Sequence, residues 1–103
     1  MATNSAESGG EPLLVAETRP ALAAKARIQV DRVTQKPVLL YPEGVVVLNE
    51  TGAAILQLCD GQRNLAEIIA ELARKYGTEE AALRDDVTAY LRGLYRHSLI
   101  ELR

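Results

Sequence analysis

The chain has 103 residues, a formal net charge of −2 at neutral pH, and a hydrophobic fraction of 48% that includes no Phe and no Trp. A single domain of this size buries only about 60% of the surface its unfolded chain exposes, so a deep active-site cleft would consume most of its core. The near balance of 12 basic and 14 acidic residues argues against a nucleic-acid-binding protein, which normally carries a basic face.

The first part of the chain differs in composition from the rest. Residues up to about Pro12 are rich in Ser, Gly, Ala and Glu, which predicts disorder. They lack a secretory-signal pattern, no apolar run approaches a membrane span, and the single Cys fits a reducing compartment. We therefore expect a cytoplasmic protein that does not contact membranes, with a disordered or loosely ordered arm over residues 1–18 and a folded domain over residues 19–103.

Three short strands are predicted to follow the arm. Residues 27–33 alternate polar and apolar side chains, which directs Ile28, Val30 and Val33 toward a core. Two further strands are predicted over residues 38–41 and 45–48. Turn residues separate the three segments, so they form an antiparallel meander.

The apolar spacing then changes to that of helices. Asn49, Asn64 and Thr78 can each begin a helix, because a short polar side chain can accept a hydrogen bond from a free backbone N–H. Gly77 can end the second helix. The stripes of apolar side chains comprise Gly52, Ile55, Leu56 and Cys59 in the first helix, Leu65, Ile68, Ile69, Leu72 and Tyr76 in the second, and Leu83, Val87, Tyr90, Leu91 and Leu94 in the third.

A short closing strand is predicted over residues 99–102. The expected fold class is therefore α+β and winged-helix-like, with a three-stranded antiparallel meander followed by three helices.

Several of these segments resemble the PqqD family, the peptide chaperones of pyrroloquinoline quinone (PQQ) biosynthesis. The resemblance covers roughly residues 19–102, and the family often has Thr where this chain has Asn64. The matching segments are Leu-Leu-Tyr-Pro-Glu-Gly at 39–44, Val-Leu-Asn at 47–49, Ala-Ala-Ile-Leu at 53–56, Cys-Asp-Gly at 59–61 and Glu-Ile-Ile at 67–69.

This resemblance implies a function and two partners. The domain would bind the leader of a ribosomally made, PqqA-like precursor peptide as an extra strand against its third strand, beside its third helix. It would deliver that peptide to a PqqE-like radical S-adenosylmethionine (SAM) enzyme, which joins a Glu and a Tyr of the precursor. No cofactor is implied for the chain itself.

An edge strand with unpaired N–H and C=O groups permits this mode of binding, which is called β-augmentation. If the third strand is that edge, the groove beside it is floored by the third helix. The candidate peptide-binding residues are Val45, Val46, Val47 and Leu48 in the strand and Leu83, Val87, Tyr90 and Leu91 in the helix. Without the resemblance, a strand of valines is more often only core-facing, and most of a helical apolar stripe is core.

No catalytic residue and no metal site are predicted, so we expect a binding protein and not an enzyme. A lone Cys59 on an apolar helix face is typical of a buried small hydrophobic residue. His97 has no second His or Cys nearby with which to bind a metal. Adjacent acidic residues, such as Asp85 and Asp86, point in different directions on a helix and do not converge on one substrate atom.

The alternative function is a winged-helix DNA-binding regulator, because the fold alone does not fix function. Such a protein needs basic residues on its recognition helix, whereas the second helix carries only Arg74 and Lys75 beside two Glu residues. For the oligomeric state we expect a monomer or a weak or arm-swapped homodimer.

Overall fold

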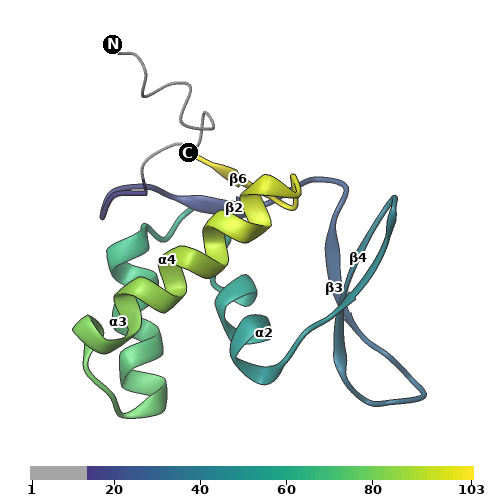
Figure 1. Ribbon diagram of the computed structural model, residues 1–103, viewed down its shortest axis with the longest axis horizontal. Coiled ribbons are helices and arrows are strands. Elements are labelled where there is room, and N and C mark those ends of the chain that lie inside the picture. The colour runs from purple at the N-terminus through teal and green to yellow at the C-terminus, as the bar shows by residue number, and fades with distance from the viewer. Residues whose placement is uncertain (1–13) are drawn as a thin grey trace.

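The structure is a computed structural model that describes residues 14–103, and the disorder predicted up to Pro12 lies outside the described residues (Figure 1). The elements in chain order are β2 (Pro20–Leu22), β3 (Arg27–Val30), β4 (Pro37–Tyr41), β5 (Gly44–Val47), α2 (Glu50–Gln57), α3 (Leu65–Tyr76), α4 (Glu80–Arg96) and β6 (Ile100–Leu102).

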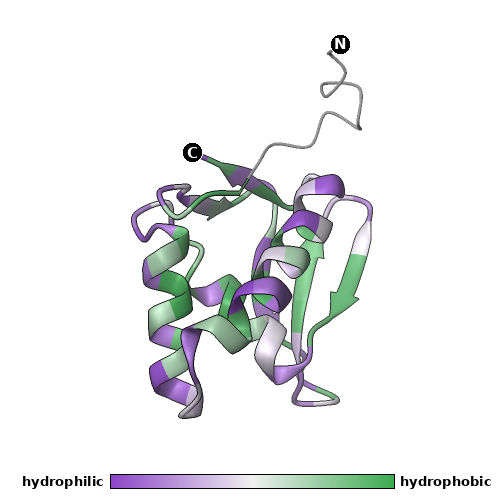
Figure 2. Cartoon of the chain, turned by 60° about the vertical axis from the view of Figure 1, so that its left-hand side comes forward, coloured by the Kyte–Doolittle hydropathy of each residue, from purple (hydrophilic) through white to green (hydrophobic). Residues whose placement is uncertain are grey.

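The strands form two antiparallel sheets. Strands β3, β4 and β5 make a three-stranded sheet in that order, and three helices follow it, which confirms the predicted fold class. The closing strand β6 pairs with β2 in a separate two-stranded sheet near the C-terminal end of α4 (Figure 1). Figure 2 shows strongly hydrophobic strands in the larger sheet beside helices of mixed hydropathy.

One hydrophobic core joins the larger sheet to the three helices. Its fully buried side chains come from β4 and from each of the three helices, so a single interior holds the elements together. Its largest members are Leu39, Leu56, Ile68, Ile69, Leu72, Val87 and Leu91. None of the helices within residues 14–103 is long and apolar enough to cross a membrane.

The helix ends agree with the predicted caps at two of three starts. The side chain of Asn49 accepts a hydrogen bond from the N–H of Gly52 at 2.6 Å. Asn64 and Glu67 form a reciprocal capping box with two bonds of 2.8 Å. Gly77 ends α3 in the left-handed conformation, with φ of 64°. The predicted start at Thr78 is wrong, because α4 is capped by Glu79 without a side-chain hydrogen bond.

We predict that Asn64→Ala lowers the free energy of unfolding by about 1 kcal/mol, because the backbone N–H of Glu67 loses the side-chain oxygen that accepts its hydrogen bond. Urea denaturation followed by circular dichroism measures the change. Thr78→Ala is the matched control and is expected to have a smaller effect, since its side chain caps nothing. Equal losses in the two variants would contradict the capping argument.

The predicted strand over residues 27–33 is too long. Strand β3 ends at Val30, and Val30 and Val33 have 56% and 90% of their surface exposed, although both were expected to face the core. Only Ile28 packs against the core. The side chain of Asp31 accepts hydrogen bonds from the N–H of Val33 and the hydroxyl of Thr34, and this local turn takes the chain away from the sheet.

The segment before β3 contains strand β2, which was not predicted. Residues 14–18, the end of the expected arm, lie against the start of α3. The N–H groups of Leu65 and Ala66 donate to the carbonyls of Thr18 and Ala16, and Leu14 is buried in the core. These bonds satisfy two of the N–H groups that a helix start leaves without partners.

Candidate functional site

Strand β5 forms an open edge of the larger sheet. It pairs with β4 on one side only, and no described strand pairs with its other side. Its sequence, Gly-Val-Val-Val, contains no Lys and no Pro, the residues that commonly protect sheet edges from pairing with another chain. The edge is therefore available to an additional strand.

The register shows which backbone groups face that edge. The N–H of Leu48 donates to the carbonyl of Pro37 at 3.0 Å. Hydrogen-bonded pairs alternate along an antiparallel ladder, so Val46, which is opposite Leu39, also directs its N–H and C=O toward β4. Val45 and Val47 therefore direct theirs away from the sheet, and they alone in β5 present both groups to an incoming strand.

The side chains of β5 also alternate, between the two faces of the sheet. Val46 shares the face of fully buried Leu39 and packs against the core. Val45 and Val47 lie on the opposite face with 58% and 66% of their surface exposed. Leu48, the next residue, is buried. Of the four predicted strand residues, Val45 and Val47 combine free backbone groups with exposed side chains.

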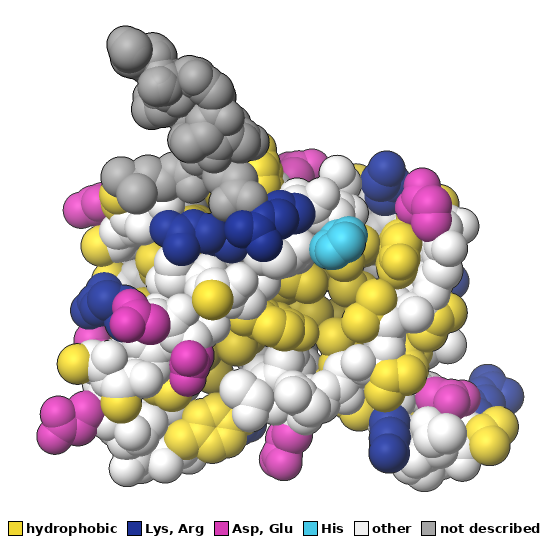
Figure 3. Space-filling model, viewed as in Figure 1, with side chains coloured by type: hydrophobic (Ala, Val, Ile, Leu, Met, Phe, Trp, Pro, Cys, Tyr) yellow, Lys and Arg dark blue, Asp and Glu magenta, His cyan; other side chains and the backbone are white. Residues whose placement is uncertain are grey.

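Two cavities mark the ends of the space beside α4. One, of about 320 Å³, is lined by residues that include Glu43 before β5 and His97 at the end of α4. The other, of about 190 Å³, is lined by residues that include Asn49 after β5 and Val87 in α4. Strand β5 and the C-terminal half of α4 thus both extend from one cavity to the other, in opposite directions. Figure 3 shows a recessed hydrophobic area between α4 and the sheet, bordered by the histidine side chain.

Three of the four α4 residues predicted to bind the peptide line the smaller cavity. Leu83, Val87 and Tyr90 line it together, whereas Leu91 lies in the core with 0% of its surface exposed. Leu83 and Tyr90 are half-buried, and burial raises the pKa of Tyr90 above its usual value. Leu91 therefore belongs to the hydrophobic core and does not line the cavity.

Sequence reasoning missed the residues that α2 and its cap contribute to the same cavity. Asn49, Thr51, Gly52 and Ile55 line its other side. At Gly52, a Cβ atom would lie against the Tyr90 hydroxyl and 3.0 Å from Tyr90 Cζ, which is tighter than real contacts allow. Glycine at this position lets the Tyr90 ring pack directly on α2.

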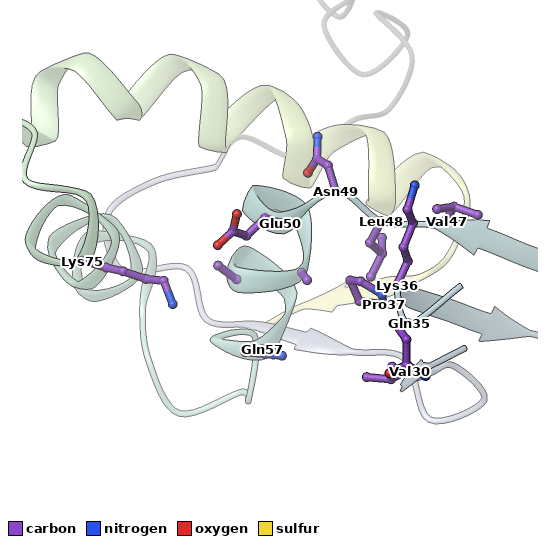
Figure 4. Close-up of a pocket in the computed structure, with 12 residues that line it drawn as sticks. Val30, Gln35, Lys36, Pro37, Val47, Leu48, Asn49, Glu50, Gln57 and Lys75 are labelled. Atoms are coloured by element: carbon purple, nitrogen blue, oxygen red, sulfur yellow. The ribbon is translucent and has the colours of Figure 1, made fainter. Parts of the chain in front are cut away.

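A larger groove of about 780 Å³ lies on another side of α2 (Figure 4). Its walls come from the β3–β4 end of the sheet and from α2, with Val47 and Leu48 at the end of β5 and Lys75 from α3. The groove thus meets the β5 edge at one point only. It shares Asn49 with the smaller cavity, so α2 separates the two spaces.

The described part of the chain contains neither a reactive thiol nor a cluster of metal-ligand side chains. Cys59 is buried, its thiol donates to the Ile55 carbonyl at 3.3 Å, and burial raises its pKa to about 12. A thiol with so high a pKa is not a nucleophile near neutral pH. Among residues 14–103, no three His, Cys, Asp or Glu side chains lie together as metal ligands.

Known proteins are similar to this chain in sequence. A family profile described as coenzyme PQQ synthesis protein D (PqqD) matches residues 37–100. The chain is 47% identical over 70 residues to a PqqA binding protein of Methylococcus capsulatus. The aligned stretch covers 68% of this chain and 73% of that protein. It is 38% identical over 86 residues to a PqqA binding protein of Xanthomonas axonopodis pv. citri, and this alignment covers 84% of this chain and 94% of that protein.

Two solved structures are also similar. The solution NMR structure of the PqqD truncation of Methylobacterium extorquens PqqCD matches with a TM-score of 0.69 and 32% identity, over 80% of this chain and 87% of that one. That protein is described as a functional, stand-alone recognition element for ribosomally synthesized and post-translationally modified peptides. The crystal structure of PqqD from Xanthomonas campestris matches with a TM-score of 0.52 and 34% identity, over 77% and 88% of the two chains. The chain belongs to the PqqD family.

Proposed function

We propose that this chain is a peptide chaperone of PQQ biosynthesis, which binds the leader of a PqqA-type precursor peptide by strand addition to β5. The observation that carries the proposal is the open edge, where Val45 and Val47 present N–H and C=O groups without partners in the sheet. The relatives' description as PqqA binding proteins supports the identity of the peptide.

The two parts of the site have separate roles in this mechanism. Main-chain bonds to Val45 and Val47 supply affinity that is independent of the peptide's sequence. Side chains of the added strand that point toward α4 reach the recessed surface and the cavity lined by Leu83, Val87 and Tyr90. These side-chain contacts supply specificity, because their shape and polarity differ from one peptide residue to the next.

The chemical modification of the peptide is assigned to a partner, a PqqE-like radical SAM enzyme. In the proposal the chain contributes by holding the peptide at a high effective concentration near that enzyme and by fixing its orientation. The surface that contacts the enzyme must leave the β5 edge and α4 accessible to the peptide.

Titration of the isotope-labelled protein with a PqqA-type peptide, followed by amide NMR shifts, tests the proposal. We expect the largest shifts at Val45 and Val47 and along the side of α4 that contains Leu83 and Tyr90. Duplex DNA is the comparison ligand, because DNA binding weakens steeply with salt. A salt-sensitive response to DNA without a response to the peptide would replace this proposal with the DNA-binding regulator.

A further inference from the structure

The cavity between the three helices is small and mostly apolar. Its volume of about 190 Å³ is below the range of cofactor and drug-sized pockets and suits one side chain of a bound peptide. The walls come from all three helices. The apolar wall residues are Ile55, Leu72, Leu83 and Val87.

The opening of this cavity carries one charge. Asp86 is the only charged residue that lines it. The Asp86 carboxylate is exposed and makes no ion pair or hydrogen bond with another described residue, including its neighbour Arg84. The ammonium of Lys75 lies 5.9 Å from the centre of the Tyr76 ring and lines the larger groove on the other side of α2.

Aromatic and polar groups complete the opening. Tyr76 and Tyr90 both line the cavity. The Tyr90 hydroxyl makes no hydrogen bond with another described residue, so it is available to a ligand. The side-chain oxygen of Asn49 already accepts the N–H of Gly52.

These features match the side chain of Lys or Arg. Such a side chain places an aliphatic stem on apolar walls and keeps its cationic head at the polar opening. The carboxylate of Asp86, which has no partner among the described residues, attracts that head. A Glu or Asp side chain would instead be repelled by Asp86.

The cavity is also within reach of the peptide's path. Asn49, which lines it, comes two residues after Val47, the last residue of β5. We infer that the cavity binds a Lys or Arg side chain of the precursor peptide, with its cationic head against the carboxylate of Asp86. This inference rests on the proposed strand addition to β5 and adds the class of residue that anchors the strand.

Asp86→Asn tests the anchor, with Asp85→Asn as its matched control. Both changes remove one carboxylate from the same turn of α4, but Asp85 does not line the cavity. Isothermal titration with a PqqA-type peptide is expected to show about fivefold weaker binding for Asp86→Asn, the upper range for an accessible ion pair. Asp85→Asn is expected to leave the affinity unchanged, and the difference should disappear at about 1 M salt.

A second set of peptides identifies the anchoring residue. In each peptide one Lys or Arg is replaced by norleucine, which keeps an aliphatic stem and removes the charge. At one position the replacement should weaken binding to the unchanged protein but not to Asp86→Asn. Such a double-mutant cycle isolates the energy of the pair itself.

The outcomes separate this inference from the function on which it rests. Peptide binding that is equal in the unchanged protein, Asp86→Asn and Asp85→Asn would overturn the anchor and leave strand addition in place. An equal loss in both variants would also overturn it, because only the general charge of α4 would then matter. Absence of peptide binding to the unchanged protein would overturn the proposed function and the anchor together.

Discussion

Val47→Pro is expected to weaken peptide binding by on the order of a hundredfold while the domain stays folded. The variant removes an N–H that faces the open edge, so a carbonyl of the added strand loses its donor, which costs about 1–3 kcal/mol. The proline ring also occupies the space where the added strand approaches. The ladder with β4 is retained, because the bonds of β5 to β4 come from the alternate residues.

Val30→Pro is the matched control for this prediction. Val30 lies in β3, the opposite edge of the same sheet. The N–H of Asp31 donates to the carbonyl of Lys36 at 2.8 Å, so the alternation directs the N–H of Val30 outward as well. Val30 and Val47 are similarly exposed, and both line the larger groove beside α2.

Isothermal titration with the peptide and thermal unfolding followed by circular dichroism measure both effects. Unchanged affinity in Val47→Pro would refute strand addition to β5. An equal loss in both proline variants would instead indicate binding in the groove that both residues line.

The helices were predictable because the signals that define them are local. Asn64 and Gly77 lie within a turn of the residues they cap. The spacing of Leu65, Ile68 and Leu72 places all three on the buried face of α3. The strand β2 was not predictable in this way. Its three residues have no pattern of their own, and they pair with β6, with Pro20 opposite Leu102 at the other end of the chain.

The candidate site was predictable only in outline. The resemblance to a peptide-binding family selected residues 45–48 and one stripe of α4, but a stripe does not separate a cavity wall from the core. Leu91 is fully buried because α4 packs on both α3 and β6. The backbone N–H and C=O groups of Val45 and Val47 face the open edge because of the register with β4, and no local sequence pattern specifies that register. Gly52 and Asp86 enter the site only when three helices come together.

Gly52→Ala is expected to lower the free energy of unfolding by about 1–2 kcal/mol, although alanine favours helices over glycine by about 1 kcal/mol. The added Cβ would press on the Tyr90 hydroxyl and lie 3.0 Å from Tyr90 Cζ and 3.1 Å from Asn49 Oδ1. Overpacking of this kind costs about 1–3 kcal/mol. Because Tyr90 lines the small cavity, its displacement should also weaken peptide binding.

Gly93→Ala in α4 is the control, since a Cβ there meets nothing within 4 Å. It should stabilise the protein by about 0.5–1 kcal/mol, because only the helix preference of alanine acts. Urea denaturation of both variants, and of Gly52→Ala combined with Tyr90→Phe, completes the test. Loss of the hydroxyl should recover part of the stability by removing the tightest contact. If Gly52→Ala stabilises the protein as Gly93→Ala does, the packing of Tyr90 on Gly52 does not constrain the site.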